Sequence, residues 1–154
     1  FAVEKVHQFL RFDDKASILV LAGGTGCGKT VAASIACAFH PGKMVKAAEF
    51  VRIGMFPDSG GKDTLRDFEN ARIGVIDDMG AEPQDSKGYA YAALFDAFEG
   101  RYDAGTKTII TTNLTIDEFR ARYGTGAGVR FWDRVRGDAR WIDVPGKSLR
   151  ERPV

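Results

Sequence analysis

The chain has 154 residues, of which 44% are hydrophobic and 28% charged, with a formal net charge of +1. This composition is typical of one soluble domain, and no apolar run approaches the ~20 residues that a membrane-spanning helix needs. The sequence does not open with a basic segment followed by an apolar one, so secretion is not expected. Two cysteines, Cys27 and Cys37, are too few for a disulfide framework and favour reduced thiols in a cytoplasmic protein.

Apolar runs alternate with amphipathic segments along the chain. In chain order the patterns predict a helix over 4–10, a strand over 17–23, a helix over 29–40, a short strand passing into a helix over 44–51, a loop over 55–63, a helix over 64–71, a strand over 72–78, a helix over 87–105, a strand over 107–113, a helix over 115–124, a loop over 124–128, a helix over 129–137 and a strand over 139–144. This alternation predicts a three-layer α/β fold with a mostly parallel sheet. Ligands of such folds bind at the carboxyl ends of the strands.

The segment GGTGCGKT, residues 23–30, follows a predicted strand and opens a predicted helix. It fits the pattern G-x-x-x-x-G-K-[ST], in which backbone N–H groups of the loop and of the helix start surround phosphate oxygens. We expect Lys29 to bridge the β- and γ-phosphates of ATP and the Thr30 hydroxyl to bind Mg²⁺. The residues predicted to contact the nucleotide are Gly24, Thr25, Gly26, Cys27, Gly28, Lys29, Thr30 and Val31.

Polar residues end the predicted strands over 72–78 and 107–113. The strand VIDD ends in two adjacent carboxylates, which repel each other unless a cation lies nearby. Asp77 is predicted to hold Mg²⁺ together with Thr30, and Asp78 to orient or activate an attacking water. Asn113 ends the strand IITTN, where its amide can donate to the γ-phosphate and help to position that water.

The last quarter of the chain is rich in arginine: eight of the nine basic residues after residue 117 are Arg. No carboxylate partner for them is obvious from the sequence around 130–136. A phosphoryl-transfer site gains much of its rate from an arginine on the transferring phosphate, so Arg130, Arg134 and Arg136 are candidates, with Arg150 as a separate one. A solvated basic face is the alternative interpretation.

Together these segments resemble the AAA+ ATPases of the DnaC/DnaI helicase-loader and IstB transposition-helper group, over about residues 1–150. GGTGCGKT is similar to the Walker A motif of the group, VIDDMGAE to its Walker B motif and TTNL to its sensor 1. RFWDRVRG resembles the arginine-finger helix, which implies that Arg134 reaches the nucleotide of a neighbouring subunit. KSLR resembles sensor 2, which implies that Arg150 contacts phosphate within its own subunit. The implied fold is a P-loop NTPase (AAA+ / RecA-like) with a reduced lid.

The resemblance implies an oligomeric, Mg²⁺-dependent ATPase with composite inter-subunit ATP sites that acts on single-stranded DNA. DRVRG and SLR are more similar to the loader branch, whose partner is a replicative helicase. An IstB-like transposition helper with a transposase partner is the alternative. Two further alternatives are a small-molecule or nucleotide kinase and a nucleotide-dependent binding module that acts as a switch with little hydrolysis.

We expect residues 1–154 to form a single ATPase domain. The chain opens at Phe1 rather than Met, and the group's N-terminal partner-binding region is not in this sequence. We therefore expect a fragment of a longer protein, and the identity of its partner stays open.

The segment after the paired carboxylates is the candidate for contact with nucleic acid. Ser86, Lys87 and Tyr89 provide a hydroxyl, a cation and a stacking ring, which suit sequence-independent binding of single strands. Phe56 and Lys62 offer a similar pair. The alternative for Tyr89 is an exposed helix start with its ring packed on the flank of the helix.

Overall fold

The computed structural model describes residues 1–11, 14–84 and 88–148. At its centre lies a five-stranded sheet in which all neighbouring strands are parallel, in the order β2–β3–β4–β1–β5. The strands are β1 (Ile18–Ala22), β2 (Gly42–Lys46), β3 (Ile73–Met79), β4 (Lys107–Thr112) and β5 (Ala139–Asp143). The predicted α/β class is confirmed, and all five carboxyl ends lie along one edge of the sheet.

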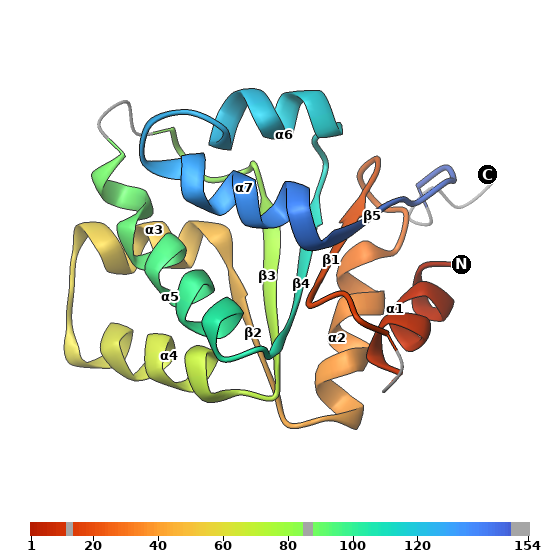
Figure 1. Ribbon diagram of the computed structural model, residues 1–154, viewed down its shortest axis with the longest axis horizontal. Coiled ribbons are helices and arrows are strands. Elements are labelled where there is room, and N and C mark those ends of the chain that lie inside the picture. The colour runs from red at the N-terminus through yellow and green to blue at the C-terminus, as the bar shows by residue number, and fades with distance from the viewer. Residues whose placement is uncertain (12–13, 85–87, 149–154) are drawn as a thin grey trace, which may run out of the picture.

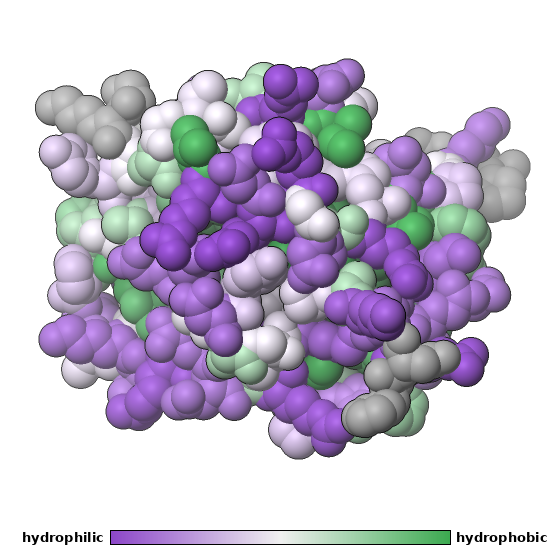
Figure 2. Space-filling view, viewed as in Figure 1, coloured by the Kyte–Doolittle hydropathy of each residue, from purple (hydrophilic) through white to green (hydrophobic). Residues whose placement is uncertain are grey.

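Helices cover both faces of this sheet and complete the three layers (Figure 1). They are α1 (Ala2–Leu10), α2 (Lys29–Phe39), α3 (Ala47–Met55), α4 (Ser59–Asn70), α5 (Ala92–Asp103), α6 (Ile116–Tyr123) and α7 (Val129–Asp138), with 3₁₀ turns at Tyr89–Tyr91 and Gly126–Gly128. Helices α1 and α2 lie on one face and α3, α4, α5 and α7 on the other, while α6 lies beyond the carboxyl ends of the strands. The outer surface over α5 and α7 is mostly hydrophilic (Figure 2).

The central strands are buried on both faces, as expected of a parallel sheet covered by helices. All five residues of β1 are buried, and the first four alternate between two hydrophobic clusters. Ile18 and Val20 pack with the α3–α7 layer, whereas Leu19 and Leu21 pack with α1 and α2. The strand therefore carries no polar side chain until it reaches the glycine loop at its end.

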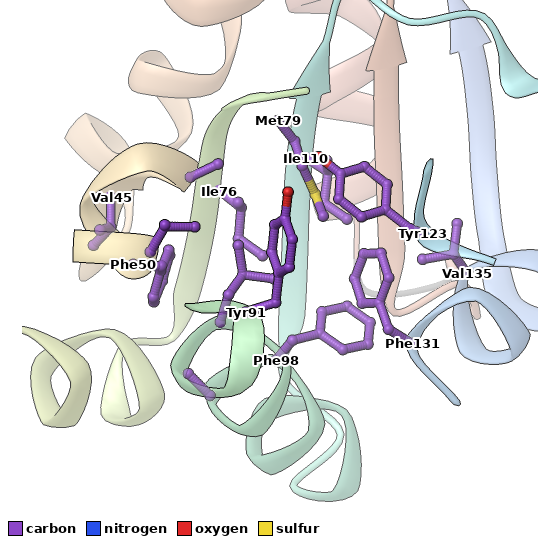
Figure 3. Packing of buried hydrophobic residues seen from close by; sticks show 14 of the residues in the cluster. Val45, Phe50, Ile76, Met79, Tyr91, Phe98, Ile110, Tyr123, Phe131 and Val135 are labelled. Atoms are coloured by element: carbon purple, nitrogen blue, oxygen red, sulfur yellow. The ribbon is translucent and has the colours of Figure 1, made fainter. Parts of the chain in front are cut away.

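The two clusters are built from side chains of different size. The α3–α7 side is aromatic: Phe98 and Phe131, for example, meet edge to face with ring centroids 4.7 Å apart (Figure 3). On the other side α2 presents Ala32, Ala33 and Ala36 to the sheet. Small side chains let the backbone of α2 approach β2 and β3 closely, which fixes the helix that begins at the glycine loop.

The pairing of β3 with β4 shifts near their carboxyl ends. Ile76 lies opposite Ile110, but Met79, rather than Asp78, lies opposite Thr112. One extra residue of β3 is therefore accommodated in this interval, as in a β-bulge, which bends the strand and redirects a side chain. The bulge falls on the paired aspartates.

The structure corrects two sequence-based boundaries. The predicted loop over 55–63 is partly helical, because α4 begins at Ser59 and Asp58 caps it by accepting the N–H of Gly61 at 2.6 Å. The glycines and proline of this segment favoured a loop, but the cap satisfies a free N–H of the first turn. The predicted helix over 87–105 begins as an α-helix only at Ala92, after a 3₁₀ turn that follows Gly88.

Candidate nucleotide-binding site

The glycine loop connects β1 to α2 at the carboxyl edge of the sheet. Its base is tied to β4, since the N–H of Gly23 donates to the carbonyl of Thr112 at 3.2 Å. Gly28 has φ +93°, a left-handed conformation that favours glycine, and it turns the chain directly into α2. The unpaired N–H groups at the start of α2 therefore face the loop, an arrangement that attracts anions.

Lys29 is a buried cation whose described hydrogen-bond partners are all neutral. Its side chain passes back under the loop, and Nζ donates to the carbonyl oxygens of Gly23 at 2.8 Å and Gly24 at 2.7 Å. The sulfur of Cys27 lies 3.5 Å from the same nitrogen. Because Lys29 is only 7% exposed and neutral groups do not balance its charge, an anion bound in the loop would be stabilised by it.

Asp77 and Thr30 form a pair of oxygen ligands beside the loop. The buried carboxylate of Asp77 accepts a hydrogen bond from the Thr30 hydroxyl at 2.9 Å and from the Thr111 hydroxyl at 2.7 Å. A hydroxyl and a carboxylate oxygen suit Mg²⁺, which is held by few protein ligands together with substrate phosphates. No group of three or more His, Cys, Asp or Glu that could hold a metal occurs in the described residues, so Thr30 and Asp77 would hold Mg²⁺ together with phosphate oxygens and waters.

Asp78 lies at the bulge in an unusual backbone conformation. It is the only non-glycine residue with positive φ (57°) in the described part of the chain, and its side chain is exposed. Its N–H donates to the Thr111 hydroxyl at 2.9 Å, so Thr111 contacts the backbone of one aspartate and the carboxylate of the other. Sequence reasoning missed Thr111, although its position in the TTN strand end, beside the aspartate pair, was a usable signal.

These groups converge on one cavity of about 390 Å³. It is lined by Thr25, Gly26, Gly28, Lys29, Thr30, Val31, Lys46, Asp77, Asp78, Thr111 and Asn113. Of the predicted nucleotide contacts in the described chain, Gly24 and Cys27 do not line it. Lys46 was also missed: it ends β2 in register with Asp77, so a basic residue at a strand end was the available signal.

The arginines of α7 do not line this cavity, and they have carboxylate partners. Glu99 of α5 binds Arg134 at 3.1 Å and Arg130 at 2.9 Å, and the Arg134 guanidinium lies 4.6 Å from the centroid of the Tyr102 ring. Arg136 pairs with Asp133 of its own helix at 3.1 Å. Carboxylate partners that are not obvious from the sequence are thus brought close to these arginines by tertiary packing or by helix geometry.

The remaining predicted residues are only partly described. Ser86, Lys87 and Arg150 lie outside the described residues. Tyr89 is 78% exposed and lines a groove of about 460 Å³ together with Phe56, which comes from the end of α3. The two aromatic residues that the sequence suggested separately are thus brought to one surface.

A glycine loop between β1 and α2, paired aspartates on β3 and a polar end of β4, all on a parallel sheet, define a P-loop NTPase of the AAA+ class. The family model described as IstB-like ATP binding protein matches residues 3–153, and the chain belongs to this family. The predicted membership of the DnaC/IstB-like AAA+ group is confirmed.

Several solved structures share this fold at low sequence identity. A DnaI structure has a TM-score of 0.71 at 20% identity, covering 97% of this chain and 81% of that one. The DnaC helicase loader has a TM-score of 0.70 at 18% identity, covering 92% and 87%. AMPPCP-bound DnaA from Aquifex aeolicus has 0.70 at 16%, covering 92% and 44%. A search of curated protein sequences finds no match to this chain. None of the described helices is long and apolar enough to span a membrane.

Proposed function

We propose that this chain hydrolyses ATP to ADP and phosphate in the cavity at the carboxyl edge of its sheet. The observation that carries the proposal is the convergence there of the Lys29 ammonium, the Thr30–Asp77 oxygen pair and the bulged Asp78. ATP would supply the phosphoryl group, and Mg²⁺ would supply positive charge that neutralises the phosphate oxygens. A nucleotide kinase would need an acceptor pocket in addition, which makes it the weaker candidate.

The proposal gives the polar groups of the cavity three roles. The loop N–H groups and Lys29 bind the phosphates and stabilise their charge. Thr30 and Asp77 provide oxygen ligands for Mg²⁺. Asp78 and Asn113 lie on the exposed side of the cavity, where they orient the attacking water.

The arginine-finger proposal places Arg134 at the nucleotide of a neighbouring subunit of a homo-oligomer. In support, Arg134 is partly exposed on α7 and does not line its own chain's cavity. Within one chain we propose Arg150 as the phosphate contact. In support, Ser148, two residues earlier in the sequence, lies so close to the loop that a side chain at Gly26 would meet its hydroxyl.

We further propose that single-stranded DNA binds along the groove that contains Phe56 and Tyr89, with Ser86 and Lys87 as further contacts. Exposed rings suit stacking on bases irrespective of sequence. A solved structure of similar fold, at 15% identity, is the replication initiator DnaA bound to AMPPCP and single-stranded DNA.

The proposed partner is a replicative helicase, in a protein that acts in the cytoplasm as a helicase loader. Similarity of fold to the DnaC helicase loader supports this proposal. Membership of the IstB-like family supports the alternative, a transposition helper that acts with a transposase. We propose that the ATPase module spans residues 1–154 and that partner recognition resides in a separate domain.

ATP turnover measured against protein concentration tests the proposal. We expect activity to rise more than linearly, Lys29→Ala and Arg134→Ala to be inactive, and a mixture of Arg134→Ala with Asp78→Asn to recover part of the turnover. Recovery requires that one variant donate the finger and the other the water-orienting carboxylate. Strictly linear activity with a fully active Arg134→Ala would contradict the composite site, and transfer of phosphate to an acceptor instead of its release would indicate a kinase.

A further inference from the structure

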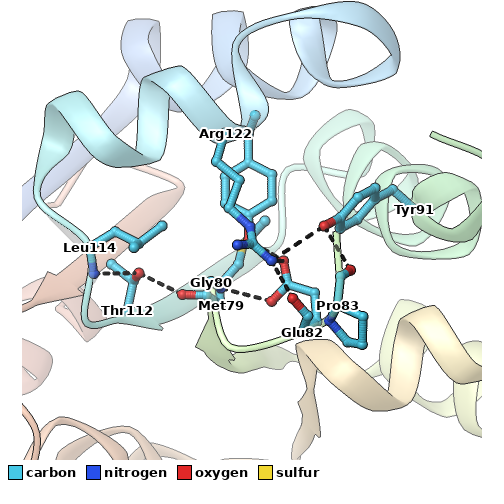
Figure 4. A network of polar contacts seen from close by, with 9 residues as sticks. Met79, Gly80, Glu82, Pro83, Tyr91, Thr112, Leu114 and Arg122 are labelled. Carbon is cyan, nitrogen blue, oxygen red and sulfur yellow. Dashed lines mark hydrogen bonds and ion pairs between the residues drawn. The ribbon is translucent and has the colours of Figure 1, made fainter. Parts of the chain in front are cut away.

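The turn that follows β3 is fixed by a buried carboxylate, that of Glu82 (Figure 4). Its side chain has no exposed surface, and Oε2 accepts the N–H of Gly80 at 2.7 Å. Oε1 accepts the hydroxyl of Tyr123 and lies 3.4 Å from Nη2 of Arg122, which also donates to the Glu82 carbonyl. Glu82 thus joins the turn after the paired aspartates to the C-terminal end of α6.

The same turn is held from its other side by the end of β4. The carbonyl of Met79 accepts the Thr112 hydroxyl at 2.6 Å, and that hydroxyl accepts the N–H of Leu114 at 3.1 Å. Gly80 has φ +105°, and a Cβ there would lie 2.8 Å from the Leu114 side chain. The turn is therefore clamped between the residues that flank Asn113 and the carboxylate of Glu82.

The position of Asp78 depends on this clamp. A non-glycine residue with positive φ is strained and persists only where the surrounding structure determines its conformation. One hydrogen bond, from the Asp78 N–H to Thr111, fixes it on the N-terminal side. On the C-terminal side the Asp78 carbonyl accepts the N–H of Ala81 at 3.2 Å, and the N–H of Gly80, which lies between them, donates to the Glu82 carboxylate.

A purely structural role would be served more simply by apolar packing, because α6 already packs its aromatic residues against the core. Tyr123 and Phe131 of α7 lie 5.9 Å apart edge to face, and Phe119 is fully buried. Burying a carboxylate against an arginine and a tyrosine is costly unless every polar group is satisfied. This network nevertheless lies beside Asp78, the residue proposed to orient the attacking water.

We propose that Glu82 is a positioning residue of the hydrolytic site: it fixes the 79–82 turn on α6 so that Asp78 keeps its place beside Thr111. The proposal rests on the proposed ATP hydrolysis. Glu82 itself does not line the cavity and does not contact the nucleotide. Its loss should therefore affect the chemical step and leave binding of the nucleotide intact.

The test compares Glu82→Gln and Tyr123→Phe with Glu69→Gln, the same change at an exposed carboxylate of α4. We expect kcat to fall about 100-fold in Glu82→Gln, as for a misplaced catalytic group. KM and the affinity for a fluorescent ATP analogue should stay unchanged, and Glu69→Gln should behave as wild type. Glu82→Asp, which keeps the charge but is shorter, should recover only part of kcat. If Glu82→Gln does not fold, Tyr123→Phe, which lacks a single hydroxyl, provides the measurement, with a smaller fall in kcat.

Hydrogen exchange at the Gly80 amide provides a readout that does not depend on turnover. Faster exchange in Glu82→Gln than in Glu69→Gln supports the clamp. Unchanged exchange, or a loss of kcat matched by an equal loss of affinity, overturns the inference. A wild-type chain without turnover would overturn the proposed hydrolysis and the catalytic role of Glu82 with it, while the exchange data would still decide whether the clamp exists.

Discussion

Two buried cations lie at opposite edges of the same sheet and do different work. Lys29 lies at the carboxyl edge, donates to two loop carbonyls and lines a cavity. Arg101 lies at the amino edge with no exposed surface, and its guanidinium donates to the carbonyls of Phe68 at 2.6 Å, Ala71 at 2.7 Å and Lys107 at 2.6 Å. Both have neutral hydrogen-bond partners, so charge alone does not distinguish a structural cation from a ligand-binding one.

The two cations differ in how much free space surrounds the charged group. The planar fork of Arg101 satisfies carbonyls at the end of α4 and the start of β4 at the same time, and a Cβ on Gly74 would lie 2.4 Å from its Nε. No room is left for a ligand, and burial lowers its pKa to about 10. The single ammonium of Lys29, by contrast, faces open volume. Under the proposed function, a buried cation binds a ligand where its surroundings leave room for an anion, and it is structural where they do not.

Removal of Arg101 should have the largest effect on the fold. In Arg101→Met the carbonyls at the end of α4 and the start of β4 lose their donor, so we expect the free energy of unfolding to fall by about 3 kcal/mol. Urea unfolding followed by circular dichroism measures it. The affinity of the folded fraction for ATP should not change. A Met variant as stable as wild type would contradict the structural role of Arg101.

Removal of Lys29 should give the opposite pattern. In Lys29→Ala we expect the affinity for ATP to fall about 100-fold, because the phosphates lose their contact with the positively charged ammonium. The unfolding midpoint should change little. Titration with a fluorescent ATP analogue measures the affinity, and Lys15→Ala, at an exposed lysine, is the matched control. The comparison fails if Lys29→Ala binds ATP normally and is as unstable as the Arg101 variant.

A third substitution tests whether a residue affects ATP binding merely because it lies near the carboxyl edge of the sheet. Thr115, two residues after Asn113, caps α6 in a capping box with Glu118. Thr115→Ala should lower the free energy of unfolding by about 1 kcal/mol and leave ATP affinity unchanged. Thermal unfolding and nucleotide titration give both values. A large loss of affinity would show that the cap belongs to the site.

The same capping box gives a pH dependence. Hydrogen bonds from the Thr115 N–H and hydroxyl lower the pKa of Glu118, so the folded state binds this proton less tightly than the unfolded state. Its stabilising contribution is complete above the ordinary pKa of 4.5 and is lost as the pH falls through the lowered value. The free energy of unfolding of Glu118→Gln should therefore be lower than that of wild type at neutral pH, and the two values should converge in acid.

Much of the fold and the main binding loop could be predicted from the sequence, because they depend on local patterns. Continuous apolar strands, the spacing of GGTGCGKT and the acidic end of β3 are visible within a few residues. Features that depend on pairing across the fold could not be predicted. The bulge at Asp78 follows from the register between β3 and β4, and Arg134 meets Glu99 only because α5 and α7 are neighbours. Thr111 gains its role only when β4 lies beside β3.

The central claim is that the cavity carries out hydrolysis in addition to binding. The most direct measurement is the affinity and the turnover of ATP in Asp78→Asn, an isosteric change that removes the carboxylate. We expect wild-type affinity for a fluorescent ATP analogue with turnover reduced to background, because Asp78 orients the water and does not hold the phosphates. Wild-type turnover in Asp78→Asn, or loss of nucleotide binding together with loss of turnover, would contradict this account.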